Sequence, residues 1–444
     1  MAIPSSARPR RFSLLTYGSR GDVEPFVALG LGLSRAGHSV RLAAPAPFRP
    51  LVESYGLSFS ALPGDPDRLA LALVDRAGMS WPRMIARMIE YVQPLAGEVF
   101  RSTLEATDQA EVIIHSFLMT EAGHTIARSR GLPDISAQLF PVFVTTSEFP
   151  ALVFPDLPLG NLYRRATHTL NTAVFRQGGR FLYRRLRAKT AGLPELAPWP
   201  FGGPPSASTP ILFAFSPSLL PAPRDWPGYA SVTGYWNLPP PDGWSPPDSL
   251  LRFLEAGPTP IYIGVGSMRT RRLKDLVEVV ADAVRETGQR AVLGFPQAWL
   301  EGLAEGDRFY GGEGIPHSWL FPRVLFVLHH GGAGTTGAAL RAGVPSSAAP
   351  FSADQAFWAR RILRLGLGPP APPALRLTSR RLAGIIDRAL TEPSFASRAR
   401  QMSESVRRED GVAFALHRIE EYLDGGVPAR ELRRQLVPDG RKRG

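Results

Sequence analysis

The sequence contains no cysteine, which excludes disulfide bonds, thiolate zinc sites, iron–sulfur clusters and cysteine nucleophiles together. It also lacks any run of about 18 consecutive apolar residues, the length that a membrane-spanning helix needs. The basic start of the chain, residues 1–11, is not followed by an apolar run with a cleavage site. We therefore expect a soluble protein of the cytoplasm that is not exported.

Lysine is scarce as well, with only three residues among the 51 basic ones. The formal net charge is +12, but residues 1–11 contribute +3 of it and residues 425–444 contribute +4. Neither a basic helix, nor a basic stripe interleaved with aromatic residues, nor a zinc-finger spacing is recognisable, so we expect no nucleic-acid partner. The basic tail, residues 425–444, is expected to be a disordered and solvated end, or else to bring the protein to the inner face of an anionic membrane.

The length of 444 residues and the hydrophobic content of 44% predict two domains, each with a sizeable core. Strands alternate with helices along the chain, as in parallel α/β sheets. The first unit consists of a strand at 12–17, a glycine turn at 18–22, a helix at 23–36 and a strand at 39–44. Together they predict a βαβ unit at the start of a sheet, to which later strands at 111–115 and 135–138 are added.

Proline-rich sequence at 236–248 interrupts this alternation, and we interpret it as part of an interdomain linker. The alternation then restarts, with strands expected at 260–265, 290–294 and 324–329 and helices at 272–286, 335–342, 353–365, 379–390 and 394–423. The sequence therefore predicts an α/β protein of two Rossmann-like domains that face each other across a cleft. The predicted division is an N-terminal domain at 1–236, a linker at 237–258, a C-terminal domain with its helices at 259–424, and the tail at 425–444.

A glycine-rich segment at 329–336 lies where an apolar strand stops and a helix begins. Glycines let backbone N–H groups approach an anion, the hydroxyls of Thr335 and Thr336 add donors, and the helix N-terminus adds partial positive charge. Only one of the adjacent His329 and His330 is expected to reach a ligand, because neighbouring residues of a strand face opposite ways. The pattern predicts a phosphate site, and a plain glycine turn beside core histidines is the alternative.

The same segment satisfies the dinucleotide-binding pattern G-x-G-x-x-G through Gly332, Gly334 and Gly337, with Asp354 about 20 residues further on. Such a fingerprint normally opens its domain, whereas this one follows several strands of the second domain. Its position favours a different diphosphate ligand, and an NAD(P)-dependent oxidoreductase remains an alternative. A noncatalytic protein that binds a nucleotide sugar or a lipid is another.

Two separated sets of motifs resemble those of the family 1 glycosyltransferases, which have the two-domain GT-B fold. The first, at 18–25, is similar to the N-terminal signature of the branch that contains sterol glucosyltransferases and glycopeptide or macrolide glycosyltransferases. The second, at 315–322, 329–336 and 350–355, is similar to the family's donor-binding signature in order and spacing. The resemblance spans nearly the whole chain and implies an N-terminal acceptor domain and a C-terminal donor domain.

The resemblance implies a diphosphate site in which His330 contacts the donor and Gly332 and Gly334 bring backbone amides to it. Thr335 stands in place of the family's usual serine as a phosphate contact, and Ser267 belongs to a second loop that faces the diphosphate. Further along, Asp354 and Gln355 are expected to hydrogen-bond the sugar hydroxyls, since a carboxylate and an amide can together accept and donate.

Plant members of the family stack a tryptophan on the nucleobase, and the matching position here is Gly314. The backbone of Ile315 and the side chain of Trp319 are the remaining candidates for base recognition. The choice between uridine and thymidine diphosphate stays open, as does the identity of the sugar.

The resemblance also assigns the loop Gly18, Ser19, Arg20 and Gly21 to the site and places Asp22 where plant members carry a histidine. An acceptor hydroxyl needs a base to remove its proton, and Asp22 at the carboxyl edge of the first sheet is our candidate. The alternative is that Asp22 only caps the helix that follows it. A single displacement between base and leaving group would invert the anomeric centre.

No metal and no cofactor beyond the nucleotide-sugar co-substrate are expected. The single D-x-D sequence, at 65–67, is typical of a turn rather than of a magnesium site. For the acceptor, an apolar stripe at helical spacing contains two methionines, Met84 and Met88, among Trp81, Ile85, Ile89 and Val92. Core packing is one interpretation of this stripe. The other is contact with a hydrophobic hydroxylated acceptor such as a sterol, polyketide, carotenoid or other lipid.

Overall fold

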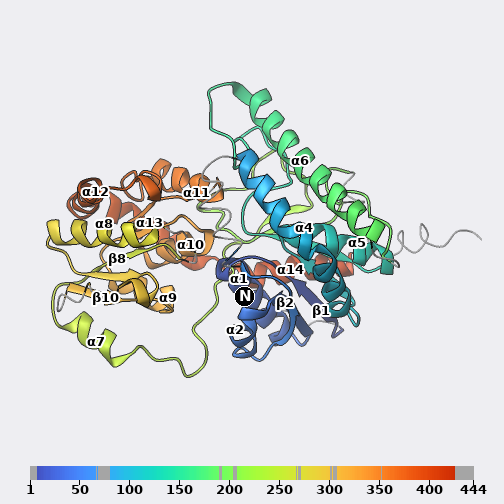
Figure 1. The fold of residues 1–444 in the computed structure, drawn as a ribbon, viewed down its shortest axis with the longest axis horizontal. Helices are drawn as coiled ribbons and strands as arrows, with labels where there is room; N and C mark the ends of the chain where they lie inside the picture. Colours follow the sequence, from blue (N-terminus) through green and yellow to red (C-terminus); the bar gives the residue numbers. More distant parts are fainter. Residues whose placement is uncertain are drawn as a thin grey trace, which may run out of the picture.

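The computed structural model describes residues 8–425 apart from 67, 69–80, 190–192, 204–207, 267, 269–271, 301–302, 304–307 and 352. Two parallel β-sheets organise this part of the chain, and helices cover both faces of each sheet (Figure 1). This arrangement is the predicted α/β architecture. No helix of the described residues is long and apolar enough to cross a bilayer.

The N-terminal sheet has seven strands among the described residues, in the order β3-β2-β1-β4-β5-β6-β7. Its strands are β1 (Arg11–Leu15), β2 (Ser39–Pro45), β3 (Ser58–Leu62), β4 (Val112–His115), β5 (Asp134–Gln138), β6 (Ile211–Phe213) and β7 (Ala230–Val232). The predicted βαβ unit is present as β1, α1 (Arg20–Arg35) and β2, and Phe12 lies opposite Val40 in the register. All pairs in the sheet are parallel, so the loops that follow the strands gather at one edge.

Alternate residues of the central strands enter two different cores, as the pleat requires. Phe12 and Leu14 pack with α1 and with α14 (Gly411–Asp424), whereas Leu15 faces the opposite core. That second core is covered by α4 (Trp81–Ala106) and α5 (Thr120–Arg130), and α6 (Gly160–Lys189) packs in turn on α4. In Figure 1, α6 therefore lies at the outer edge of the molecule. A short helix, α2 (Arg49–Glu53), follows β2.

The C-terminal sheet has five strands among the described residues, in the order β10-β9-β8-β11-β12. They are β8 (Ile261–Gly264), β9 (Ala291–Gly294), β10 (Phe309–Gly311), β11 (Val327–His329) and β12 (Ser346–Ala348). One face packs against α8 (Leu273–Glu286) and α12 (Ser379–Thr391). The other packs against α7 (Asp248–Glu255), α9 (His317–Leu320) and α10 (Ala333–Ala342). The helix α11 (Ala353–Arg364) follows β12.

The linker predicted at 237–258 includes a helix that is part of the C-terminal core. Leu250 and Phe253 of α7 are buried against Tyr262, Val292 and Val327 of the C-terminal sheet. A sequence rich in proline thus gives an extended segment only up to about residue 247, where Pro247 precedes the helix.

The single helix predicted at 394–423 is two helices, α13 (Pro393–Arg408) and α14, because the chain turns at Glu409. The side chain of Asp410 accepts a hydrogen bond from the N–H of Ala413 and so caps α14. Glu409 accepts hydrogen bonds from the hydroxyls of Ser216 and Ser218, both at 2.7 Å. After this turn, α14 returns to the N-terminal sheet and packs on α1, although the predicted division placed residues up to 424 in the C-terminal domain.

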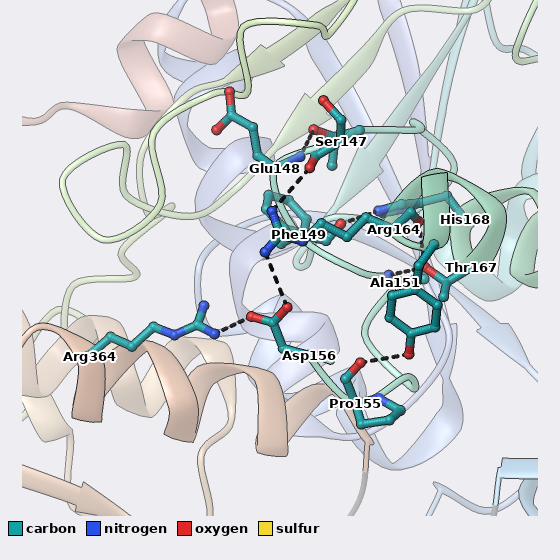
Figure 2. Close-up of polar contacts among 12 residues, drawn as sticks. Ser147, Glu148, Phe149, Ala151, Pro155, Asp156, Arg164, Thr167, His168 and Arg364 are labelled. Carbon is teal, nitrogen blue, oxygen red and sulfur yellow. Dashed lines mark hydrogen bonds and ion pairs between the residues drawn. The ribbon is translucent and has the colours of Figure 1, made fainter. Parts of the chain in front are cut away.

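Further contacts tie the two halves together around the segment 147–156. Asp156 pairs with Arg164 of α6 at 3.7 Å and also with Arg364 of α11, as Figure 2 shows. The same segment is held to α6 by two hydrogen bonds, one from the N–H of Ala151 to the hydroxyl of Thr167 and one from His168 to the carbonyl of Phe149. Helix α11, which carries two predicted sugar contacts, is therefore connected directly to the N-terminal half.

Candidate functional site

The glycine-rich segment follows β11 and opens α10, as predicted. Gly332 is the N-cap of α10. The first hydrogen bond of the helix is donated by the N–H of Thr336 to the carbonyl of Gly332, at 3.0 Å. The three preceding N–H groups therefore have no acceptor within the helix. Gly334 is exposed, and a Cβ built on it would meet nothing within 4 Å. This end of α10 combines free donors, the positive end of the helix dipole and open space, which together suit an anion.

His330 lies between two glycine loops. A Cβ on Gly266, after β8, would come within 2.5 Å of its ring, and a Cβ on Gly332 within 2.3 Å. Both positions must therefore be glycine for the ring to fit, and Gly266 also has a φ of +59°. Burial lowers the pKa of His330 to about 4, so the ring is neutral near pH 7. A neutral imidazole can donate one hydrogen bond to a ligand, but it adds no net charge to the site.

His329 has a different environment, although it adjoins His330 in the chain. Its Nδ1 accepts a hydrogen bond from the N–H of Gly331 at 3.1 Å, and the residue is 1% exposed. Burial holds its pKa well below the usual range, with a smaller contribution from His330. Nδ1 of His329 is therefore used within its own loop, and His330 is the histidine that lies beside both glycine loops.

Two of the predicted donor contacts have side chains that are turned inward. Thr336 is fully buried, and its hydroxyl donates to the carbonyl of Gly332 at 2.9 Å. Gln355 is 4% exposed, and its amide oxygen accepts from the N–H of Phe351 at 2.8 Å while its amide nitrogen faces the sulfur of Met268. These side chains stabilise the turns before α10 and α11, because their polar atoms are used there. In this conformation these polar atoms bond within the protein, and their contact with a ligand stays a prediction.

The other predicted donor residues lie around the same edge of the sheet. Thr335 and Asp354 are partly buried in the first turns of α10 and α11. Ile315 is partly buried just before α9, and Trp319 of α9 lies under the guanidinium of Arg323 at 4.2 Å. Trp319 also meets Trp244 edge to face, with ring centroids 5.7 Å apart. Ser267 lies outside the described residues.

Asp22 is at the third position of α1, and Ser19 is the N-cap. The backbone N–H and the hydroxyl of Ser19 both donate to Oδ2 of Asp22, at 2.7 and 2.9 Å. Asp22 therefore does contribute to helix capping, as the alternative predicted. It does so as the third residue of a capping box, whose N-cap is Ser19. Burial raises the pKa of the Asp22 carboxyl, and the two hydrogen bonds from Ser19 partly oppose this rise. Gly18 is required here, because a Cβ on it would come within 2.4 Å of Oδ2.

The loop that contains Asp22 faces the donor side of the second domain. Helix α1 contacts α10, and Arg20 contributes to lowering the pKa of His317, to about 4, after burial and His330. Arg20 itself is paired with Glu24 at 2.7 Å, and Gly21 is exposed. The structure thus brings the first loop and the glycine-rich loop, more than 300 residues apart in the chain, to the same region.

An apolar cavity of about 200 Å³ lies in the N-terminal domain between α4, α5 and α6. It is lined by aromatic and aliphatic side chains that include Tyr17, Phe117, Phe143, Phe175 and Trp199. Val92 of the predicted apolar stripe lines it as well, whereas the side chains of Met84 and Met88 lie outside the described residues. Tyr17 immediately precedes the Gly18 loop, so one wall of the cavity continues into the segment that carries Asp22.

One carboxylate, Glu121 of α5, lines this otherwise apolar cavity. Burial raises the pKa of Glu121 to about 7, against the opposing effects of His124, Arg180 and Arg176. A Cβ on Gly179 of α6 would lie 3.1 Å from its carboxylate, so the glycine allows α6 to approach this group. Glu121 was not predicted from the sequence, because no local pattern distinguishes it from other acidic residues in the first turn of a helix.

Residues 12–122 match the glycosyltransferase family 28 N-terminal domain, and residues 306–410 match the erythromycin biosynthesis protein CIII-like C-terminal domain. The O-mycaminosyltylonolide 6-deoxyallosyltransferase of Streptomyces fradiae is 38% identical over 438 residues, which cover 93% of this chain and 98% of that protein. The sterol 3-beta-glucosyltransferase of Cryptococcus neoformans is 32% identical over 94% of this chain, which spans only 27% of that longer protein.

Solved structures with the same architecture are more distant in sequence. The glycotransferase of kitacinnamycin has a TM-score of 0.67 at 19% identity, with 93% of this chain and 99% of that chain covered. The calicheamicin glycosyltransferase CalG4 has a TM-score of 0.66 at 18% identity, with 95% and 100% covered. Both likenesses concern the fold, and they extend over both domains.

Proposed function

The chain belongs to the family 1 glycosyltransferases, and we propose that it moves a hexose from a UDP- or TDP-sugar to a hydroxyl of a hydrophobic small molecule or lipid, with inversion. The observation that carries this proposal is the placement of two loops at one region. One ends in a carboxylate with a raised pKa at Asp22, and the other presents the free N–H groups of α10 beside His330. The first suits a general base, and the second suits a leaving diphosphate.

In the proposed reaction, the carboxylate of Asp22 accepts the proton of the acceptor hydroxyl while that oxygen attacks the anomeric carbon. The bond between the anomeric carbon and the diphosphate oxygen breaks, and the nucleoside diphosphate leaves with the bonding electron pair. Both hydrogen bonds from Ser19 end on Oδ2, so the other oxygen of Asp22 is the one proposed to meet the acceptor. Attack opposite the leaving group converts an α-linked donor into a β-glycoside.

The leaving diphosphate would be held by α10 without a metal ion. Its negative charge would interact with the free N–H groups at the helix N-terminus and with a donor from neutral His330. Thr335 and Asp354, which are partly buried in the first turns of α10 and α11, are proposed to contact the phosphate and the sugar. Among the described residues, no group of three acidic or histidine side chains is placed to hold a metal.

The acceptor is proposed to occupy the cavity between α4, α5 and α6. Its aromatic and aliphatic lining favours an apolar molecule, and Glu121 offers one polar contact to a hydroxyl or an amino group. The names of the two relatives support an acceptor of this kind, since one acts on O-mycaminosyltylonolide and the other on a sterol. The wall formed by Tyr17 would direct the reacting hydroxyl toward the loop of Asp22.

The decisive experiment separates donor binding from chemistry. Purified protein is titrated with UDP-glucose, TDP-glucose and NAD, and then each sugar donor is incubated with a panel of hydroxylated hydrophobic acceptors. We expect binding of a sugar nucleotide, release of its diphosphate and a β-linked product. Binding of NAD alone, or sugar transfer only to small polar sugars or to protein, would overturn the proposal.

A further inference from the structure

Helix α6 has a second apolar face that no described part of the protein covers. Leu162, Leu170 and Phe181 are 82%, 50% and 49% exposed, and Ala166 and Ala173 between them are also exposed. Their spacing of three, four or eight residues places them on one side of the helix. Leu157 and Leu159, at 41% and 61% exposure, extend the apolar surface into the loop before α6. We call these seven residues the outer face of α6.

The opposite side of the same helix is fully used inside the protein. Phe175 and Leu182 line the apolar cavity, and Thr167 and His168 are buried and bonded to the segment 149–151, as Figure 2 shows. The outer face is therefore exposed in addition to the side of α6 that packs inside the protein. Figure 1 places α6 at the edge of the molecule, where a flat surface can reach it along its length.

The charge of α6 indicates what the outer face meets. Between residues 160 and 189 the chain has seven arginines and one lysine and no acidic residue. Arg176, Arg184 and Arg185 are exposed beside the apolar positions, and the guanidinium of Arg185 lies 4.4 Å from the ring of Phe181. Arg165 is exposed as well, and it pairs with Asp225 at 3.5 Å. This basic helix was not predicted from the sequence, because its apolar residues lie on two sides of the helix and do not form a single stripe. Exposed apolar residues bordered by arginines are typical of helices that lie in the interface of an anionic bilayer.

We infer that the outer face of α6 docks the protein on an anionic lipid bilayer. From Leu162 to Phe181 the face is about 28 Å long at the usual rise of a helix, so the helix would lie in the plane of the membrane with its leucines among the acyl chains. A helix at the edge of the molecule can lie against a deformable lipid surface, and the exposed arginines along α6 complement lipid phosphates. Because the inner side of α6 lines the cavity, this orientation would bring the cavity next to the membrane. The inference does not depend on which sugar or acceptor the enzyme uses.

The test is flotation of the full-length protein with vesicles. One set contains phosphatidylcholine alone, and the other contains phosphatidylcholine with phosphatidylglycerol. We expect flotation with the anionic vesicles only, and weaker flotation as salt is raised, since exposed charges are screened. Leu162→Ser combined with Leu170→Ser should weaken binding roughly tenfold or more, because two leucines no longer enter the bilayer. Arg184→Gln with Arg185→Gln should weaken it severalfold and reduce its dependence on salt.

The matched control is Leu325→Ser with Leu363→Ser, which removes two leucines of similar exposure, 45% and 47%, from the C-terminal half. We expect this control to float like the unmodified protein. The leucine variant on α6 should keep its melting temperature and its turnover with a detergent-free soluble acceptor. Unchanged flotation of that variant would assign membrane binding to another part, such as residues 426–444, and would overturn the inference. Absence of flotation together with a dimer that the variant dissociates would show that the face binds a second copy instead.

Discussion

Ser19 holds one oxygen of the Asp22 carboxylate with two hydrogen bonds, from its N–H at 2.7 Å and from its hydroxyl at 2.9 Å. Helix capping therefore uses Oδ2 of Asp22, and the proposed proton transfer would use the other oxygen. Burial raises the pKa of Asp22 and strengthens it as a base, while Ser19 favours the charged form that a base requires. The pair explains why a residue that begins a helix can also carry out proton transfer in the proposed mechanism.

The first prediction concerns the base itself. Asp22→Asn should lower kcat by about 10²-fold or more, since a general base typically contributes about 10²- to 10⁴-fold, while donor affinity changes little. The asparagine can still accept the hydrogen bonds from Ser19, so the capping box survives. Steady-state kinetics and donor titration measure the two effects separately. Near-normal turnover in this variant would reduce Asp22 to the capping role.

The second prediction uses Ser19 as a probe of the same carboxylate. Ser19→Ala removes one of the hydrogen bonds that hold the pKa of Asp22 down, so that pKa should rise further. The base must be deprotonated to act, and the acidic limb of the kcat profile should therefore move to higher pH. The loss of the cap should also lower the free energy of unfolding by about 0.5–2 kcal/mol. A profile that does not move, despite the lower stability, would contradict a titrating base at Asp22.

The third prediction concerns His330. His330→Ala should weaken binding of a nucleoside diphosphate by about 1.5–3 kcal/mol, the range for hydrogen bonds to charged groups, and weaken binding of the nucleoside much less. Because the pKa of His330 is lowered to about 4, its ring stays neutral and donor affinity should not depend on this group between pH 6 and 8. Calorimetric titrations with the nucleoside diphosphate and with the nucleoside, at pH 6 and at pH 8, measure these effects. Equal losses for both ligands would argue against a contact with phosphate.

The fourth prediction tests the two glycine loops around His330. Gly266→Ala should greatly weaken donor binding, because the new Cβ would lie 2.5 Å from the imidazole ring. Gly288→Ala is a matched control in the same domain. Gly288 has a similar φ, +66° against +59°, but nothing lies within 4 Å of its Cβ position. The control should lose only about 1–2 kcal/mol of stability to backbone strain and keep its donor affinity. Equal donor affinities in the two variants would show that the ring position does not matter.

The fifth prediction concerns the buried carboxyl of the cavity. The pKa of Glu121 is raised from 4.5 to about 7, so the folded state holds its proton more tightly than the unfolded chain does. The stability associated with this group is present below pH 4.5 and is lost as the pH rises through 7. Glu121→Gln should therefore become more stable than the unmodified protein across this window, by about 1–3 kcal/mol. Melting temperatures at pH 5 and pH 8 measure the difference, and a constant offset at both values would contradict the assignment.

The local pattern of the sequence was sufficient for the parts of the site that depend on short segments. The strand, glycine turn and helix around Asp22 and those around His330 were predicted from apolar runs and glycines, because the end of a parallel strand and the start of a helix are encoded within about ten residues. The family resemblance rested on the same segments and is confirmed by the relatives. The division of α13 from α14 was not predicted, although Asp410 and Gly411 are a local signal for a new helix start and Asp410 caps α14 in the structure. Distant Ser216 and Ser218 then hold the turn through Glu409.

What the sequence determined by itself is the chemistry available at each loop: the absence of cysteine, the free donors of a glycine-rich helix start, and a carboxylate after the first strand. Only the tertiary structure decided which side chains remain free for that chemistry. Thr336 and Gln355 have suitable polar groups, but packing turns them inward to satisfy nearby backbone atoms. Glu121 and Phe143 come together in one cavity, and α6 presents a basic apolar face, through contacts between helices far apart in the chain. Such contacts depend on how whole elements pack, which no local pattern specifies.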